Sequence, residues 1–150
     1  MRVILQRVKH SNLFIDSIKV ASINMGMLLL LGIEGSDTDD DINWLCTKLC
    51  GIRIFSDNEG KMNLDIKQVN GEALIVSQFT LYASTKKGNR PSFIKAAKPE
   101  IAIPLYEKFI QKMEVMLEKP CKTGKFGADM QIELVNDGPV TIILDSKNKE

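Results

Sequence analysis

MGMLLLLGI (residues 25–33) is the most apolar stretch of this 150-residue sequence, and it decides the kind of fold that the chain forms. It is far shorter than the roughly 20 residues that a membrane-spanning helix needs. A short, continuous apolar run is typical of a strand that is buried on both faces. We therefore expect a buried β-strand over residues 25–33 and no association with a membrane.

The segments around this strand predict a sheet, because apolar and polar residues alternate or form further short apolar runs. Hairpins join antiparallel neighbours, so we expect a largely antiparallel sheet. We expect a strand over residues 1–9 and a hairpin over 14–21 that turns at Asp16 and Ser17. A turn at 57–60 should separate a strand from a short extended piece. A buried strand is expected in 71–83, and two further strands in 121–146, with a break between them at Gly138–Pro139.

Two segments predict helices. The first begins at Asp37 or Thr38, where acidic residues suit the positive end of the helix dipole, and ends at Gly51. The second covers 99–117, where apolar residues recur at helical spacing. The pattern predicts one domain over residues 1–150, of the α+β type within the α/β class. We expect a mostly antiparallel, barrel-like sheet with two main helices packed on it.

Composition excludes several classes of protein. Hydrophobic residues make up 44% of the chain and charged residues 26%, as in ordinary globular proteins, and the net charge is +1. This balance is not that of a strongly basic nucleic-acid-binding chain, although it leaves room for a local basic patch. Residues 1–7 alternate like a strand, so no secretory leader is expected. Three cysteines without CxxC spacing indicate a reducing, cytoplasmic compartment and no disulfide.

The cysteines and the single histidine limit the chemistry. Cys46 and Cys50 share a helix face, either as half of a metal site or as buried thiols, and the missing second half favours buried thiols. His10 is the only histidine and no nucleophile elbow follows it, which excludes a Ser–His–Asp triad. P-loop and HExxH motifs are absent from the sequence. We expect no metal and no other cofactor, so any catalysis must use a hydroxyl, backbone groups or the substrate itself.

Ser77, Gln78 and Thr80 stand where the apolar strand of residues 73–76 turns polar. Strand ends and the loops after them often carry function, and these side chains offer hydroxyl and amide groups. Backbone N–H groups at a strand end are able to face a developing oxyanion. The spacing alone favours ordinary strand residues over catalytic ones. The hypothesis that Thr80 is a nucleophile has even less support, because no base lies near it in the sequence.

A cationic loop follows directly. Lys86, Lys87 and Arg90 surround a glycine, a combination suited to holding phosphates, and Arg90 is the best bidentate candidate. Charge runs of this kind are usually solvated loops. The position just beyond the polar strand end leaves both interpretations open.

Two stretches resemble the signature motifs of the D-aminoacyl-tRNA deacylase family: SQFTLYASTKKGNRPSF (77–93) and NDGPVT (136–141). The resemblance extends over nearly the whole chain, through MRVILQRV at the start, GIRIFSDNEGKMNLDI in the middle, PLYEKF in the second helix and TGKFGADMQIEL near the end. Both motifs in this order, in a chain of this length, are strongly specific. Ser84 and Asn89 depart from the residue types common in the family, and both fall in the cationic loop.

The resemblance implies an enzyme that hydrolyses the ester between a D-amino acid, or glycine mischarged on tRNA-Ala, and the 3′-terminal adenosine of tRNA. It implies a cytoplasmic homodimer in which Gly138–Pro139 is a cis pair and enters the active site of the other subunit. The carbonyl groups of Gly138 and Pro139 would then clash with an L side chain and leave space for a D side chain. This is selection by exclusion.

The resemblance also assigns residues. Arg7 corresponds to an arginine that braces the Gly–Pro loop, although strand alternation on its own suggested a solvent-facing side chain. Ser77, Gln78, Phe79 and Thr80 correspond to pocket residues, and the backbone N–H of Phe79, Thr80 or both would polarise the ester carbonyl. Ala102, Phe126 and Met130 would line the pocket, with core packing as the alternative for Phe126 and Met130. Lys86, Lys87 and Arg90 would contact tRNA.

Two mechanisms fit the family: Thr80 as a covalent nucleophile, or assistance by the 2′-OH of the terminal adenosine. The sequence offers no histidine or carboxylate in either motif to act as a base, so we favour the 2′-OH. Three rival functions stay open. They are a non-catalytic nucleic-acid-binding protein of the same fold, an editing enzyme for L-amino acids with a trans Gly–Pro, and a general esterase that uses Thr80.

Overall fold

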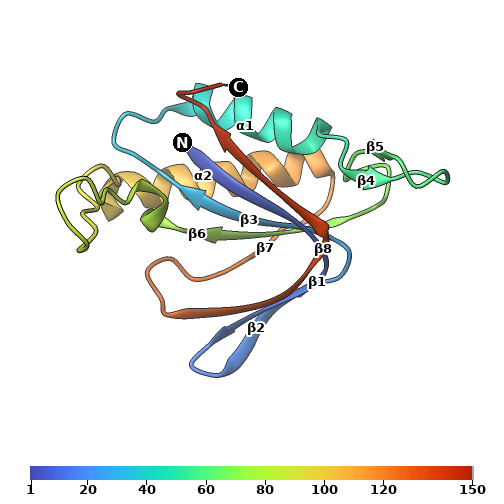
Figure 1. Cartoon of the computed structure of the whole chain (residues 1–150), viewed down its shortest axis with the longest axis horizontal. Coiled ribbons are helices and arrows are strands. Elements are labelled where there is room, and N and C mark those ends of the chain that lie inside the picture. The colour runs from blue at the N-terminus through green and yellow to red at the C-terminus, as the bar shows by residue number, and fades with distance from the viewer. Residues whose placement is uncertain (150) are drawn as a thin grey trace.

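One strongly curved sheet forms the centre of the molecule, and both long helices pack against the same face of it (Figure 1). The computed structural model describes residues 1–149. The strands are β1 (Arg2–Ile15), β2 (Ile18–Ile23), β3 (Gly26–Gly32), β4 (Phe55–Ser56), β5 (Met62–Leu64), β6 (Glu72–Ser77), β7 (Lys122–Thr123) and β8 (Met130–Asp145). The helices are α1 (Asp39–Gly51) and α2 (Pro99–Leu117), with a 3₁₀ helix at Phe79–Tyr82.

The order of the main sheet is β2-β1-β3-β6-β7, and β8 pairs with β1 along its length. The first half of β1 pairs with β3 and its second half pairs with β2, both antiparallel. β3–β6 and β6–β7 are parallel pairs. The sheet is therefore mixed, with the antiparallel majority and the barrel-like curvature that the sequence predicted.

Curvature divides the apolar core into two parts. Val3, Leu5, Met27 and Leu29 face the helices and pack with Leu45, Leu49, Phe109 and Met113 of α1 and α2. Val8, Leu13, Ile23, Leu28 and Val76 face the other way and pack among themselves. The long strand β1 contributes to both parts, because its second half curls across the face that the helices leave uncovered (Figure 1).

The helices and the first hairpin follow the predictions. α2 covers the predicted range 99–117, with Pro99 in its first turn. α1 begins after Thr38, whose N–H donates to the carboxylate of Asp41 at 2.8 Å. The β1–β2 turn places Asp16 and Ser17 at positive φ, as the turn prediction requires. None of the helices in residues 1–149 is long and apolar enough to cross a membrane.

Two boundaries differ from the predictions. The strand expected over residues 71–83 ends at Ser77, and residues 79–82 form the 3₁₀ helix. The break expected at Gly138–Pro139 is instead a bulge inside one continuous strand. In the ladder with β1, Thr141 pairs with Gln6 and Asn136 pairs with Val8, so residues 137–140 stand out of register. Proline has no N–H for a ladder, which is compatible with a bulge.

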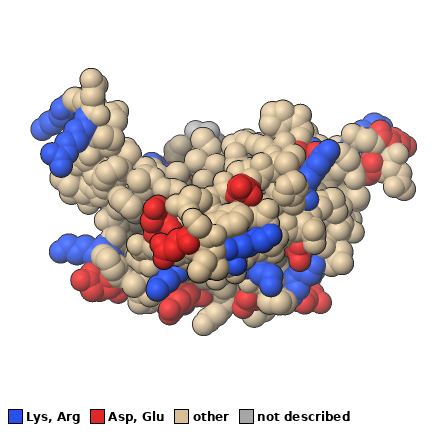
Figure 2. Space-filling view, turned by 90° about the horizontal axis from the view of Figure 1, so that it is seen from below, with Lys and Arg blue, Asp and Glu red and all other residues tan. Residues whose placement is uncertain are grey.

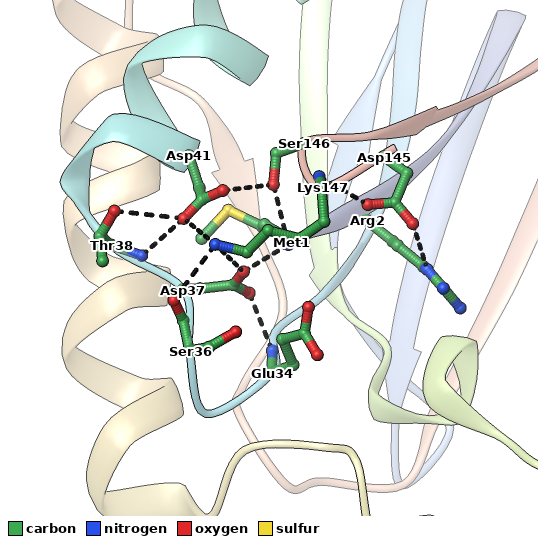
Figure 3. Close-up of polar contacts among 10 residues, drawn as sticks. All are labelled: Met1, Arg2, Glu34, Ser36, Asp37, Thr38, Asp41, Asp145, Ser146 and Lys147. Carbon is green, nitrogen blue, oxygen red and sulfur yellow. Dashed lines mark hydrogen bonds and ion pairs between the residues drawn. The ribbon is translucent and has the colours of Figure 1, made fainter. Parts of the chain in front are cut away.

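A buried polar network joins both ends of the chain to α1 (Figure 3). The α-ammonium group of Met1 donates to Asp37 and, at 2.9 Å, to Ser146 Oγ. Ser146 Oγ donates in turn to Asp41 Oδ1 at 2.6 Å, and Lys147 Nζ donates to Asp41 Oδ2 at 2.8 Å. Burial alone would raise the pKa of the Asp41 carboxyl, but the hydrogen bonds from Lys147, Ser146 and Thr38 outweigh it and hold the pKa well below its usual range.

Replacing Asp41 by asparagine is expected to lower the free energy of unfolding at pH 7 by about 1–3 kcal/mol, because hydrogen bonds to a charged group are lost. A lowered folded-state pKa contributes stability that is present above the unfolded pKa of about 4 and disappears as the pH falls. The difference between wild type and Asp41→Asn should therefore narrow between pH 4 and pH 2. Urea titrations across this range measure it, and a constant difference would contradict the assignment.

Candidate active site

A pocket of about 280 Å³ lies where β3 and β6 end, between the start of α2 and the segment that leads into β8. It brings together residues that are far apart in the sequence. Ser77, Gln78 and Phe79 come from the end of β6, Ala102 comes from α2, and Phe126 and Met130 come from the last part of the chain. Six of the residues predicted for a substrate site thus line one cavity. Thr80 lies beside it and is exposed.

The change from strand to 3₁₀ helix decides which backbone groups are free at the pocket. Gln78 N–H donates to the Leu31 carbonyl at 2.7 Å and so ends the strand ladder. The next turn closes with Leu81 N–H on the Gln78 carbonyl at 3.2 Å. The first N–H groups of a helix have no acceptor within it, so those of Phe79 and Thr80 are available to a ligand. They suit an oxygen that gains negative charge.

The Thr80 hydroxyl has no base beside it. Within residues 1–149, Thr80 Oγ1 accepts a hydrogen bond from Gln78 Nε2 and contacts neither an imidazole nor a carboxylate. His10 lies on β1, opposite Val135 of β8. A hydroxyl that accepts an amide N–H and has no proton acceptor is not activated as a nucleophile.

Aromatic side chains fix the walls of the pocket. Phe126 packs against Tyr106 with ring centroids 6.1 Å apart, and Tyr106 Oη donates to the Ile75 carbonyl at 2.8 Å. On the other side, Phe79 meets Phe93 edge-to-face at 5.1 Å. Phe126 therefore serves both the core and the pocket, the two alternatives that the sequence left open.

The cationic loop projects from the molecule beside the pocket. Ser84 and Ser92 close its base with two backbone hydrogen bonds, of 2.8 and 2.9 Å, and the Phe79–Phe93 contact ties it to the pocket wall. Lys86, Lys87 and Arg90 are exposed and form no ion pair within residues 1–149. Figure 2 shows basic side chains on the lobe at its left, where Figure 1 places this loop, while the rest of that face mixes both signs.

Gly138 and Pro139 lie at the other end of the sheet. Asn136 pairs with Val8, Val8 with Gly26, and Gly26 with Glu72, the first residue of β6. The pocket is at Ser77, the last residue of β6, five residues further along, or about 17 Å. Figure 1 shows β8 turning at the end of the sheet away from the cationic loop. The structure therefore does not bring Gly138, Pro139 and the pocket of the same chain together.

Arg7 holds the Gly138–Pro139 loop from inside, as the resemblance implied, whereas strand alternation alone had suggested a solvent-facing side chain. Arg7 is only 8% exposed. Its Nε donates to the Asp137 carbonyl at 3.0 Å and lies 3.3 Å from Asp137 Oδ2, and its Nη1 donates to the Ile54 carbonyl. Met1, Val3 and Leu5 point inward, so position 7 shares their face, and its polar head is buried because these acceptors satisfy it.

The loop is also fixed from within the strand. Val140 N–H donates to Asn136 Oδ1 at 3.0 Å, and Asn136 Nδ2 donates to Thr141 Oγ1 at 2.9 Å. These bonds close the bulge around Gly138 and Pro139, whose peptide bond is cis. Both residues are exposed, so the backbone of the loop faces solvent.

The cysteines take no part in this site. Cys46 Sγ lies 3.9 Å from the Phe109 carbonyl and Cys50 Sγ lies 4.0 Å from Met113 Sδ, both in the helix-side core. Burial raises the pKa of Cys50 to about 11. Residues 1–149 hold no group of three or more His, Cys, Asp and Glu side chains placed for a metal ion. The buried-thiol interpretation fits this geometry.

Sequence reasoning missed one polar residue of the pocket. Asp129 lies in the turn before β8 and, among the described residues 1–149, is the only charged one that lines the cavity. Nothing in its local pattern distinguishes it from a turn aspartate. Its only signal was its position directly before Met130, a residue that the resemblance had assigned to the pocket.

Comparisons with known proteins fit this arrangement. A family model described as D-Tyr-tRNA(Tyr) deacylase matches residues 4–145. The D-aminoacyl-tRNA deacylases of Flavobacterium psychrophilum and Bacteroides fragilis are 59% and 57% identical to the chain, over all of both sequences.

Two solved structures share the fold. One, described as c-Myc DNA Unwinding Element Binding Protein, is 36% identical with a TM-score of 0.90 and covers 97% of this chain and 98% of its own. The other, described as a probable eukaryotic D-amino acid tRNA deacylase, is 18% identical with a TM-score of 0.81 and covers 95% and 97%. The resemblance in the sequence is thus confirmed: the chain belongs to the D-Tyr-tRNA(Tyr) deacylase family.

Proposed function

We propose that the protein hydrolyses the ester bond of D-aminoacyl-tRNA and releases the free D-amino acid and tRNA. The observation that carries this function is a small, mostly apolar pocket that ends on free backbone N–H groups and lies beside an exposed cationic loop. Such a pocket suits an aminoacyl group, and the loop suits the phosphates of the attached RNA. The names of relatives that share the whole chain support the same activity.

The ester lies at the boundary between the two parts of the site. Lys86, Lys87 and Arg90 contact the tRNA backbone near its 3′ end, which positions the terminal adenosine. The N–H groups of Phe79 and Thr80 stabilise the negative charge that develops on the ester oxygen. This substrate is formed when tRNA is charged for translation, so the enzyme works in the cytoplasm.

Chirality is selected by a second copy of the chain. The exposed backbone of Gly138 and Pro139 lies near the level of Glu72, five residues or about 17 Å along β6 from the pocket at Ser77, too far to touch a substrate there. In a homodimer it enters the partner's pocket, where its carbonyl groups stand beside the α-carbon. An L side chain clashes with this rigid backbone, and a D side chain points away from it. Arg7 keeps the loop in place.

Glycine passes the same filter because it has no side chain. We therefore infer that glycyl-tRNA, including glycine mischarged on tRNA-Ala, is hydrolysed as well. Steric exclusion by the Gly138–Pro139 backbone rejects only a side chain that points toward it, so it cannot reject glycine.

The 2′-OH of the terminal adenosine assists the reaction. In the part of the chain that the structure describes, Thr80 contacts no base and no imidazole lines the pocket. An aminoacyl ester is already reactive, so it is sufficient to align it for attack by water and to stabilise the oxyanion. Each of these effects lowers the barrier to hydrolysis by several kcal/mol.

Replacing Thr80 by alanine is therefore expected to leave most of the activity, within about tenfold of wild type, because only a hydrogen bond to Gln78 is lost. A covalent nucleophile would instead cost on the order of a thousandfold or more. Single-turnover rates on D-tyrosyl-tRNA distinguish the two, with Thr80→Ser as the variant that keeps the hydroxyl. A large loss of rate in Thr80→Ala that is absent from Thr80→Ser would favour the esterase mechanism, in which Thr80 is the nucleophile.

The second candidate function is nucleic-acid binding without catalysis. It is favoured by the 36%-identical solved structure that is described as a DNA-unwinding-element binding protein. The experiment that separates the candidates follows the ester of D-tyrosyl-tRNA with purified protein, and measures binding of uncharged tRNA in parallel. Hydrolysis supports the deacylase. Tight binding with an intact ester would support the binding protein.

A further inference from the structure

Phe93 links the cationic loop to the wall of the candidate active site. Its ring meets the ring of Phe79 edge-to-face, with centroids 5.1 Å apart and an angle of 74° between the planes. Phe79 lines the pocket and yet is 56% exposed, so its side chain has few neighbours on the solvent side. Aromatic pairs of this geometry attract each other beyond the effect of the area that they bury. The contact with Phe93 therefore helps to fix Phe79 where it borders the pocket.

The chain is held on both sides of Phe93. On one side are the two backbone hydrogen bonds that close the base of the cationic loop. On the other side, Ala96 N–H donates to the Phe93 carbonyl at 3.0 Å, and Ala97 N–H donates to the Ile33 carbonyl at 2.9 Å. Ala97 and Ile33 both line the pocket. A shift at the base of the loop thus reaches the pocket wall through the backbone and through the ring of Phe93.

The cationic loop has few contacts of its own beyond its base. Residues 85–91 are all exposed, and within residues 1–149 the three cations of the loop form no ion pair. Segments with exposed backbone and few buried contacts belong to the least stable parts of a protein. Phosphates bound by the three cations would give the loop the contacts that the protein does not supply. The position of the loop therefore depends on whether phosphates are bound.

We propose that Phe93 is a positioning residue that couples phosphate binding by the cationic loop to the reaction at the ester. When the loop holds the tRNA backbone, Phe93 keeps Phe79 in place, and the N–H groups of Phe79 and Thr80 stay aligned with the ester oxygen. Alignment matters because these donors stabilise the oxyanion only within hydrogen-bond distance of it. The inference rests on the proposed function and adds that the RNA part of the substrate promotes the reaction itself as well as binding.

Single-turnover hydrolysis of D-tyrosyl-tRNA at a series of protein concentrations tests the coupling, because it separates the maximum rate from the affinity. Phe93→Ala removes the ring, Phe93→Tyr keeps it, and the double variant Lys86→Gln/Lys87→Gln removes two charges of the loop. Ile94→Ala is the matched control. Ile94 is the next apolar residue of the same segment, is 93% exposed and does not line the pocket.

We expect Phe93→Ala to lower the maximum rate about fivefold, as for the loss of an aromatic pair. The half-saturating protein concentration should change less than about twofold, because the phosphate-binding side chains are intact. Phe93→Tyr and Ile94→Ala should match wild type. The double lysine variant should lose both affinity and maximum rate, and adding Phe93→Ala to it should lower the rate little further, because the two changes interrupt the same coupling.

An equal loss of rate from Phe93→Ala with and without the two lysines would show that Phe93 supports the pocket independently of the loop. A loss of affinity alone in Phe93→Ala would show a role in binding only, and a lysine variant with the wild-type maximum rate would show that the loop does not position the ester. Each of these results overturns the inference. If wild type leaves D-tyrosyl-tRNA intact, the proposed function itself fails.

Discussion

Replacing Gly138 by alanine is expected to lower the ratio of D- to L-aminoacyl-tRNA hydrolysis about ten- to a hundredfold. An alanine Cβ would lie 2.8 Å from Arg7 Nη2 and 3.0 Å from Val140 Cγ2, closer than atoms pack. Gly138 also has a φ of +123°, which L residues rarely adopt. Both effects should displace the loop that, in the proposed mechanism, excludes L side chains. The ratio of kcat/KM for D- and L-tyrosyl-tRNA measures the change.

Gly60→Ala is the matched control. Gly60 has a φ of +78°, so alanine there is strained in the same sense, but its Cβ meets no atom within 4 Å. It lies in the turn between β4 and β5 and is not among the residues that line the pocket. Gly60→Ala should lose some stability and keep the D/L ratio. A ratio that is also unchanged in Gly138→Ala would contradict the role of the loop.

Filling the pocket is expected to have the second large effect. Ala102 is buried on α2 and lines the cavity, so Ala102→Phe places a ring in a space of about 280 Å³. We expect kcat/KM on D-tyrosyl-tRNA to fall about a hundredfold, because the aminoacyl group no longer fits beside Phe79 and Thr80. Binding of uncharged tRNA should change little, because the cationic loop is untouched.

The control for added bulk is Ile101→Phe, one position earlier in α2, where the side chain is exposed. It should behave like wild type. A fully active Ala102→Phe would place the chemistry elsewhere and would remove the pocket from the proposed mechanism.

Mixing these two variants tests whether the loop acts across subunits. In a mixed dimer, the open pocket of a Gly138→Ala subunit receives the intact loop of an Ala102→Phe subunit. An excess of Ala102→Phe should therefore suppress the L activity of Gly138→Ala and keep its D activity. A loop that acted within its own subunit would leave the L activity unchanged.

Much of the fold was predictable, because it depends on local signals. The helix over 99–117, the helix start after Thr38 and the Asp16–Ser17 turn all followed from spacing and capping. The parallel pairing of β3 with β6 was not predictable from these signals, because it depends on how distant strands meet. The same holds for the path of β1, which pairs with three other strands.

The site was predictable mainly from the resemblance. Residues alone marked Ser77, Gln78 and Thr80 as a polar strand end, but the 3₁₀ turn that frees the N–H groups of Phe79 and Thr80 has no clear pattern. The resemblance placed Arg7 at the Gly138–Pro139 loop, where the structure has it. The strand pattern alone suggested a solvent-facing side chain, because the partners of Arg7 at Asp137 and Ile54 are distant in sequence. Asp129 was missed for the same reason, since only the fold brings its turn to the end of β6.

Chiral exclusion by the Gly138–Pro139 loop and assistance by the 2′-OH of the tRNA can be tested in a single experiment. Hydrolysis of matched D- and L-tyrosyl-tRNA is followed beside D-tyrosyl-tRNA that ends in 2′-deoxyadenosine. We predict fast loss of the D ester, a stable L ester and a stable deoxy ester. Equal loss of the D and L esters would contradict the Gly138–Pro139 filter, and rapid loss of the deoxy ester would contradict the role of the 2′-OH.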